Sequence, residues 1–379
     1  MTDDTRITVF REPGPEWLAF ETALDGRRVP LALYGRADWV RTRPETVWLV
    51  GVSDANGTPA CGIPVVVGRS RSLPGARILR SPRFGYGLGP AAADAACAAL
   101  ADLARRVKPL RLHVELYAPE SEVRASLPES LARAGFVREP AARSYERTIL
   151  IDLRPAEEQV LASFHRTCRQ NIRGLAKYGL ECRPIDEPSL AGRMNALVSE
   201  AMTRTAGPQL AEDWDAWLAL IRARPDLAHL VGVFRNDASG PDALVGLVLG
   251  LRHGDMVEYS VAASTRIPGS RAPILYAPTW RLMQWGRSVG AATFDFGGVT
   301  AGTVRTADPV GGISDFKRSF GGSIVEVGGE FVLEPSPWRS ALARAISAAA
   351  GIIRPRGTPP KAARPPAESE VSESAQVEE

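Results

Sequence analysis

The sequence predicts an α/β protein with mixed α+β sheets, built as two tandem copies of one architecture. Short apolar strands and helices follow each other in the mixed order of an α/β fold. Residues 180–327 repeat the approximate order of elements of residues 7–153. The length of 379 residues allows two or three domains, and 45% hydrophobic with 23% charged residues is the balance of a soluble globular protein.

The first block of elements begins and ends with a strand. Asn56–Gly57 is a strong tight-turn signal between two of its strands, and the alternating residues 110–117 are typical of a half-buried strand. We expect strands at residues 7–10, 47–52, 60–68, 77–79, 110–117, 136–137 and 148–153, and helices at 15–23, 91–107 and 121–134. A first domain is therefore predicted over residues 1–153.

The second block repeats this pattern after a linking helix. We expect strands at residues 180–184, 229–234, 243–251, 256–262, 293–296 and 323–327, and helices at 190–203, 211–222 and 274–290. A second domain with its linking helix is predicted over residues 154–335, followed by a C-terminal helix over 336–354. Residues 355–379 are rich in Pro, Ala, Ser and Glu, which predicts a disordered tail.

The linking helix is predicted over residues 155–178 as a single element with a basic face. Its cations stand four residues apart, and no acidic residue occurs between Glu158 and Glu181 to relieve their repulsion. The basic side chains are His165, Arg166, Arg169, Arg173 and Lys177. This face is interpreted either as a phosphate-binding or RNA-binding surface or as a solvated helix face.

Composition excludes several classes of protein. A net charge of +3 gives no global basic field for nucleic acid. Four scattered cysteines without a CxxC pair make no disulfide framework, and four scattered histidines without HExxH predict no metal site. The acidic N-terminus is no signal peptide, and no apolar run approaches about 18 residues. A cytoplasmic protein is expected.

Residues 257–298 run as a strand, the loop STRIPGSRAP, a helix and a further strand. This order resembles acyltransferases of the GNAT class, in which a loop and a helix N-terminus cradle a pyrophosphate. Arg266, Gly269, Ser270 and Arg271 stand at the corresponding place. The loop has less glycine than is usual in that class, and Pro268 removes one N–H donor, so no coenzyme A cofactor is predicted.

The glycine-rich stretch over residues 292–331 carries a more specific resemblance. WGRSVGAATFDFGGV at 285–299 is followed by GGISDFKRSFGG at 311–322 and VEVGGEF at 325–331. These motifs resemble the FemABX family of aminoacyl-tRNA-dependent transferases, which extend peptidoglycan stem peptides. The resemblance covers roughly residues 145–335, including a similar domain junction over 148–183. It covers the first 145 residues only by architecture, apart from a glycine-aromatic loop at 84–89.

The resemblance implies two GNAT-like domains with an acceptor site between them. It implies aminoacyl transfer from a charged tRNA to an amine, such as that of a peptidoglycan precursor. The tRNA-contacting helical arm found in some members is not evident here. Arg166, Arg169, Arg173 and Lys177 would have to bind the tRNA instead.

Three residues are candidates for catalysis. The resemblance places Lys317 beside the tetrahedral oxyanion of aminolysis, where a fixed cation stabilises the developing charge; the alternative is an exposed lysine paired with Asp315. Asp295 either accepts a proton from the attacking amine or caps the following loop. Tyr259 is expected to face the cleft and orient the acceptor, or to pack in the core, with Glu258 pointing the other way.

Four residues are candidates for substrate binding. Arg204 and Arg271 would hold phosphates or a carboxylate in a bidentate manner, or form ordinary surface salt bridges. Phe316 stands beside Lys317, and Tyr86 would line the acceptor groove from the first domain. No histidine is placed as a general base, and substrate-assisted proton transfer needs none.

Two other functions compete with an aminoacyltransferase. One is an acyl-CoA-dependent N-acyltransferase acting on an amino sugar or a polysaccharide precursor. The other is a non-catalytic module that binds RNA or an anionic polymer through the basic helix. Residues 338–353 allow peripheral membrane contact, or a terminal helix packed on the body. The transferred group, the acceptor and the oligomeric state are not set by the sequence.

Overall fold

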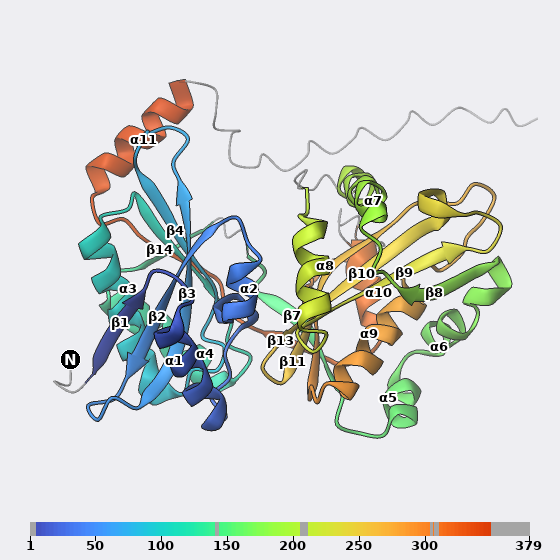
Figure 1. Cartoon of the computed structure of the whole chain (residues 1–379), viewed down its shortest axis with the longest axis horizontal. Coiled ribbons are helices and arrows are strands. Elements are labelled where there is room, and N and C mark those ends of the chain that lie inside the picture. Colours follow the sequence, from blue (N-terminus) through green and yellow to red (C-terminus); the bar gives the residue numbers. More distant parts are fainter. Residues whose placement is uncertain (1–4, 141–143, 205–210, 304–305, 307–310, 350–379) are drawn as a thin grey trace, which may run out of the picture.

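The computed structural model describes residues 5–140, 144–204, 211–303, 306 and 311–349. Two seven-stranded sheets stand side by side (Figure 1). In spatial order the first sheet contains β1 (Arg6–Phe10), β2 (Thr46–Ser53), β3 (Pro59–Arg69), β4 (Arg77–Phe84), β5 (Arg111–Leu116), β14 (Glu330–Leu333) and β6 (Val137–Arg138). The second contains β8 (Leu180–Pro184), β9 (Ala228–Arg235), β10 (Leu244–His253), β11 (Met256–Ser264), β12 (Thr293–Gly298), β7 (Arg147–Asp152) and β13 (Ser323–Glu326).

The two sheets are copies of one arrangement. Each has one parallel pair, β4 with β5 and β11 with β12, and the other strand pairs of the two sheets are antiparallel. A long helix crosses over between the parallel strands in each case, α3 (Pro90–Val107) in the first and α9 (Tyr276–Ser288) in the second. The predicted tandem architecture of mixed sheets is confirmed.

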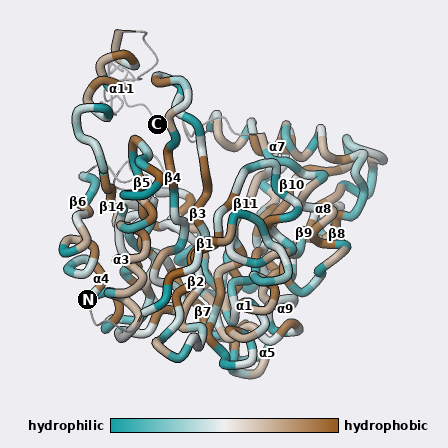
Figure 2. The backbone as a smooth tube through the Cα atoms, turned by 60° about the vertical axis from the view of Figure 1, so that its left-hand side comes forward, coloured by the Kyte–Doolittle hydropathy of each residue, from teal (hydrophilic) through white to brown (hydrophobic). Residues whose placement is uncertain are grey.

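The sheets exchange one strand each. β7 was expected to end the first domain, but it lies in the second sheet between β12 and β13. In return β14, near the end of the chain, lies in the first sheet between β5 and β6 (Figure 2). Gly328 turns the chain into this position with φ +137°, where a Cβ would stand 2.6 Å from the Leu116 side chain. The division at residue 153 therefore stays a prediction, because chain order and sheet membership differ there.

Alternation along the strands divides the apolar residues between layers. On β2, Trp48 and Val50 face the core beneath α3 and α4 (Ser121–Arg133). Val47 and Leu49 face a second core, which also contains Leu247 and Leu249 of β10 and thus spans both domains. Helices of both domains supply the middle of that core, namely α1 (Pro15–Gly26), α2 (Ala37–Arg41), α7 (Ala191–Arg204) and α8 (Trp214–Ala223). The two sheets therefore pack through shared helices.

The linking helix differs from its prediction. It is divided into α5 (Glu157–Ser163), α6 (Arg166–Arg173) and a 3-10 turn, η2 (Leu175–Tyr178). Phe164 leaves the helical conformation, with φ −73° and ψ 154°, and its buried ring packs edge-on against Trp280 and Phe320. The His165 N–H then bonds to the Ser319 carbonyl at 3.0 Å. Burial of one aromatic ring therefore breaks the expected single helix.

The remaining elements are short, apart from the C-terminal helix. They are η1 (Leu33–Gly35), η3 (Pro188–Leu190), η4 (Gly240–Ala243), α10 (Gly311–Arg318) and α11 (Pro337–Ala349). α11 packs on the first domain through Ala343, beside Leu110 and Ala76. The predicted tail over residues 355–379 lies outside the described residues. Among the described helices, none has the length and apolar character to cross a bilayer.

Candidate active site

The candidate site begins where β11 and β12 separate. These parallel strands pair only from Met256–Thr293 to Glu258–Asp295, although both continue beyond that point. Gly297, with φ +67°, lies at the irregularity that bends β12 away. The result is a wedge between two strands, with the carboxylates of Glu258 and Asp295 at its vertex.

A cavity of about 740 Å³ lies at the open end of β11. It brings together three of the four predicted substrate-binding residues, Arg204, Arg271 and Phe316. Most of the remaining lining comes from residues 264–276, between β11 and α9. Arg204 also borders a neighbouring cavity of about 490 Å³ and donates to the Ser264 carbonyl at 2.6 Å. The separated strands and this cavity together form a space for an extended substrate.

The loop that lines the cavity offers few free donors. The N–H of Ser270 bonds to Ile267, and the N–H of Ile274 bonds to Ala272, both at 3.0 Å. The N–H of Ala272 donates to the Ser270 hydroxyl at 3.2 Å. Residues 268 and 273 are prolines, which have no N–H. A pyrophosphate would therefore find fewer backbone donors here than such loops provide elsewhere.

Lys317 lies on α10, next to Phe316 of the cavity wall. Its side chain is only 7% exposed, and its Nζ donates to the Gly298 carbonyl at 2.7 Å. Burial lowers the pKa of Lys317 to about 8, although Asp295 and Glu258 oppose this shift. Asp315 pairs instead with Arg318 at 3.0 Å. The exposed Lys317–Asp315 pair, one of the two expectations, is therefore wrong.

Asp295 is fully buried, and its oxygens are occupied by donors. Oδ1 accepts from the Gly297 N–H at 2.8 Å and from the Thr148 hydroxyl. Oδ2 accepts from the Tyr117 hydroxyl at 2.7 Å and from Arg83 at 3.0 Å. The bond to Gly297 is the loop cap that the sequence allowed. The Tyr145 hydroxyl also lies 3.5 Å from Oδ2, so five donors surround the two oxygens of Asp295.

The two neighbours on β11 face opposite to the expected directions. Tyr259 was expected to face the cleft between the domains, but its ring packs against Phe294 and Phe296. Its ring centroid lies 6.5 Å from that of Phe316. Glu258 was expected to point away, but it points at the first domain and pairs with Arg83 at 3.2 Å. The face of β11 that carries Tyr259 therefore lies against the aromatic core. Of the two interpretations of Tyr259, core packing is the one seen.

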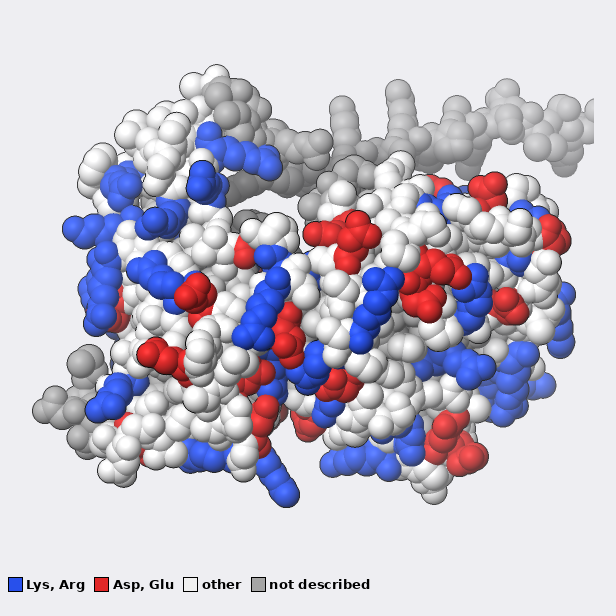
Figure 3. All heavy atoms as spheres, viewed as in Figure 1, with Lys and Arg blue, Asp and Glu red and all other residues white. Residues whose placement is uncertain are grey.

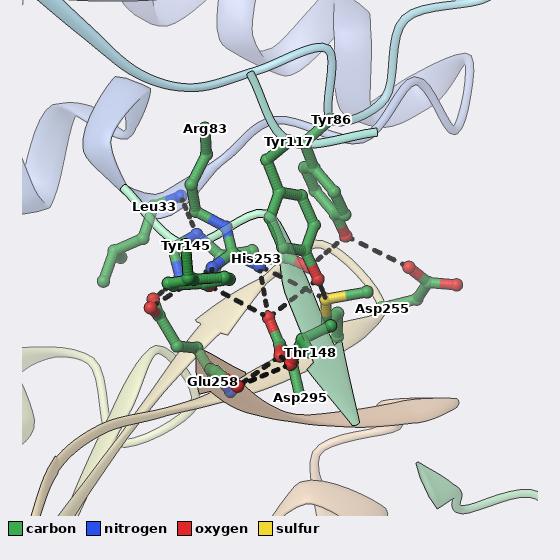
Figure 4. Close-up of polar contacts among 12 residues, drawn as sticks. Leu33, Arg83, Tyr86, Tyr117, Tyr145, Thr148, His253, Asp255, Glu258 and Asp295 are labelled. Carbon is green, nitrogen blue, oxygen red and sulfur yellow. Dashed lines mark hydrogen bonds and ion pairs between the residues drawn. The ribbon is translucent and has the colours of Figure 1, made fainter. Parts of the chain in front are cut away.

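Several polar residues at the vertex were not predicted. Figure 4 shows Arg83 and Tyr117 of the first domain reaching toward Asp295 and Glu258 of the second. His253 links the domains as well, because its Nε2 lies 2.8 Å from Glu258 and its Nδ1 accepts from the Leu33 N–H. Apart from His253 and Glu258, which are five positions apart, these partners are more than a hundred residues apart, and no local pattern in the sequence pairs them. The left-handed φ of Arg83, +49°, becomes visible only in the structure.

Tyr86 lies at the domain interface, away from the cavity. Its hydroxyl donates to the His253 carbonyl and to Asp255 at 3.1 Å. Only 9% of the side chain is exposed. The structure therefore does not bring Tyr86 together with the other predicted substrate-binding residues.

The four predicted phosphate-binding residues divide into two groups. Arg166, Arg173 and Lys177 are exposed, and Lys and Arg gather over α6 at the right of Figure 3. Arg169 instead donates to the carbonyls of Ala162 and Phe164 and thereby holds the end of α5. The break after α5 thus removes one cation from the predicted basic face.

Comparison with known proteins finds a family match for the segment that carries most of this site. Residues 241–348 match the FemAB family. This segment contains the wedge, the loop, α9, Phe316 and Lys317, and it confirms the predicted resemblance. No curated protein matches the chain at a significant level. The FemAB match covers neither Arg83 nor Arg204.

Solved structures show the same fold over most of the chain. A crystal structure of FemX has a TM-score of 0.66 and 15% identity, and the match covers 86% of this chain and 98% of that one. A tandem GNAT protein from the clavulanic acid biosynthesis pathway has a TM-score of 0.52 and 14% identity, covering 88% and 99%. L-PGS from Bacillus licheniformis has a TM-score of 0.51 and 12% identity, covering 89% and 98%. At these identities the matches establish the tandem GNAT-like fold, which acyltransferases share.

Proposed function

We propose that the protein is an aminoacyltransferase that moves an amino acid from aminoacyl-tRNA to an amine acceptor, such as a peptidoglycan precursor stem peptide or a related peptide. The observation that carries this proposal is Lys317. It is a buried cation next in sequence to Phe316 of the cavity wall, it bonds to Gly298 at the end of β12, and it lies in the FemAB-like segment. Among the described residues Lys317 forms no ion pair, and a buried cation of this kind is costly for the fold and is therefore a functional candidate.

The reaction is the aminolysis of an ester. The acceptor nitrogen attacks the aminoacyl carbonyl, and its electron pair forms the new C–N bond while the carbonyl oxygen becomes an oxyanion. The C–O bond to the ribose then breaks, and the proton lost by the amine goes to the departing hydroxyl. Lys317 is largely protonated at neutral pH and has three N–H donors, one of which bonds to Gly298. The other donors are available to the oxyanion.

The loop at residues 264–276 favours tRNA over coenzyme A as the donor. Its internal hydrogen bonds and its prolines leave it poorly suited to a pyrophosphate. The cavity instead presents Arg204 and Arg271, which suit the phosphates of a nucleotide or the carboxylate of a peptide. Arg166, Arg173 and Lys177 provide an exposed cationic surface for the body of the tRNA.

A transfer assay tests this proposal. The protein receives tRNA charged with labelled amino acids, or labelled acetyl-CoA in parallel, together with a panel of amine acceptors that includes peptidoglycan precursors. We expect label from the tRNA to enter an RNase-resistant product, with loss of transfer in Lys317→Met. Lys108→Met is the matched control because Lys108 is exposed and lies in the other domain.

Two outcomes would replace the proposal. Transfer from acetyl-CoA alone would identify the protein as an acyl-CoA-dependent N-acyltransferase, the activity class to which its GNAT-like fold also belongs. Retention of tRNA without transfer to any acceptor would favour a non-catalytic RNA-binding module.

The proposal includes peripheral contact with a membrane surface through α11. Trp338 is 70% exposed and Leu342 is 45% exposed, one helical turn apart on the same face. Arg105 and Arg106, at the end of α3, are exposed beside this helix, and Arg339 bonds to the Lys108 carbonyl. Figure 3 shows Lys and Arg gathered over this end of the first domain. An apolar helix face flanked by cations suits an anionic bilayer.

Vesicle sedimentation tests this contact. We expect binding to phosphatidylglycerol vesicles, weaker binding to phosphatidylcholine vesicles, and loss of binding in Trp338→Ser. Val137→Ser is the matched control, because Val137 is 67% exposed on the same domain and lies away from α11. Equal sedimentation of both variants would contradict the contact.

A further inference from the structure

Arg83 belongs to the first domain, yet its side chain completes the site of the second. It stands near the end of β4, where the pairing with β5 is irregular between Ser81 and Phe84. Its φ of +49° is in the left-handed region, which a residue with a Cβ adopts only when its surroundings hold it there. This backbone conformation directs the side chain across the domain boundary.

One guanidinium binds both carboxylates at the vertex of the wedge. One terminal nitrogen of Arg83 donates to Asp295 at 3.0 Å, and the other lies 3.2 Å from Glu258. The plane of the group packs 3.7 Å above the ring of Tyr117, and the side chain is only 6% exposed. Glu258 and Asp295 are the last paired residues before β11 and β12 diverge. Arg83 therefore occupies the point from which the wedge opens.

The charges around Lys317 come from four elements and nearly cancel. Asp295 of β12 and Glu258 of β11 act on Lys317 electrostatically, and Arg83 of β4 is paired with both of these carboxylates. Tyr145 lies beside Gly297 and receives a hydrogen bond from Arg83 at 3.2 Å. Burial and the nearby Arg83 lower the pKa of His253, so this ring is neutral against Glu258. Two anions and two cations are thus enclosed together.

This charge balance explains why the side chain of Lys317 does not bind to either carboxylate. Burial alone would raise the pKa of Glu258, but Arg83 and the bond to His253 lower it to about 2. Glu258 is therefore charged, and Arg83 engages the carboxylates of both Glu258 and Asp295. Lys317 has the Gly298 carbonyl as its hydrogen-bond acceptor instead of a carboxylate.

We propose that Arg83 is a positioning residue for Lys317: by binding Glu258 and Asp295 together, it prevents either carboxylate from capturing the lysine. The first domain thereby sets the protonation state of the amine in the second domain. The catalytic meaning of this inference rests on the proposed function of Lys317. The charge balance around Lys317 does not depend on that function.

Competitive labelling of lysines tests the charge balance without any substrate. The chain has four lysines, at positions 108, 177, 317 and 361, so each labelled peptide is easily assigned by mass spectrometry. The full-length protein is acetylated with acetic anhydride between pH 6.5 and 10.5, and the midpoint of labelling is read for each lysine. Lys108 and Lys177 are exposed internal controls. We expect the wild-type Lys317 midpoint to lie below both.

Arg83→Gln is expected to raise the Lys317 midpoint by on the order of one pH unit, because a nearby cation is lost and two carboxylates are released. Arg83→Lys should restore part of the shift, and Arg83→Gln with Glu258→Gln should restore most of it. An unchanged Lys317 midpoint in Arg83→Gln would overturn the proposal. Should that variant not fold, Arg83→Lys decides the matter: one ammonium group cannot bind both carboxylates as a guanidinium does, so the Lys317 midpoint must still rise, and an unchanged midpoint would overturn the proposal.

The transfer assay adds a second readout. The rate of transfer is measured as a function of pH in the wild type and in Arg83→Gln. The limb of this profile that reflects titration of Lys317 should shift by the same amount as the labelling midpoint. A merely structural role of Arg83 would instead lower the rate at all pH values alike. An absence of transfer in the wild type would refute the proposed function but leave the labelling result to decide the role of Arg83.

Discussion

Lys317→Met should make the protein more stable at neutral pH while abolishing its activity. Burial lowers the pKa of Lys317 from 10.5 in the open chain to about 8 in the fold. Between these values the unfolded state binds more protons than the native state, so wild-type stability rises with pH across this window. Below about pH 8 the full difference acts against the fold, and it is worth about 3 kcal/mol.

Methionine removes this penalty but also removes the hydrogen bond to the Gly298 carbonyl, which contributes about 1 kcal/mol. The expected gain at pH 7 is therefore about 2 kcal/mol, and it should fall below about 1 kcal/mol by pH 9.5. Transfer should fall by about 100-fold or more, the usual cost of losing one group that stabilises an oxyanion.

Urea denaturation followed by tryptophan fluorescence at pH 7 and pH 9.5 measures both stabilities, with Lys108→Met as the exposed control. A variant that is no more stable than wild type at pH 7 would refute the reasoning that a charged amine is buried. A gain that does not depend on pH would refute it as well, because better packing of methionine explains such a gain without any charge.

Three further predictions concern other parts of the molecule. Gly328→Ala should destabilise the protein by about 2 kcal/mol or more in urea denaturation, because alanine strains the positive φ and contacts Leu116; Gly26→Ala, with open space around its Cβ position, is the control. Arg173→Glu should weaken tRNA binding and reduce the salt slope of log K by about 1 per lost phosphate contact, measured by filter binding; an unchanged slope would remove α6 from the tRNA surface. Arg271→Met should raise KM for the donor or acceptor by about tenfold with little change in kcat, because it lines the cavity without reaching Lys317; a fall in kcat alone would contradict a role in binding.

Local pattern was enough to predict most helices and strands and the repeated architecture. Strand alternation and turn signals act over a few residues, so they are visible in a single sequence. The break at Phe164 was not visible, because periodicity continues through it and the cause is a pocket formed by Trp280 and Phe320. The exchange of β7 and β14 was also missed, since both read as ordinary strands and only their partners differ.

The candidate site was predicted where a motif lies within one segment. Phe316 and Lys317 share a short glycine-framed stretch, and Arg271 lies in a loop of recognisable kind. Arg83 has no such signal: it is one of many arginines, and its partners lie 175 and 212 positions away. The directions of Glu258 and Tyr259 were reversed because alternation says that neighbours face opposite sides but not which side meets the other domain.

The position of β14 has a consequence for how the chain is made. During synthesis the N-terminal domain of a protein usually folds first, as its residues leave the ribosome. Here the strand between β5 and β6 emerges only after the whole second domain has been translated. Until then β5 has an open edge that is able to pair with other chains. The nascent protein therefore spends most of its synthesis with an incomplete first sheet. A premature stop before residue 330 leaves the first domain without β14, although that domain is encoded at the other end of the chain.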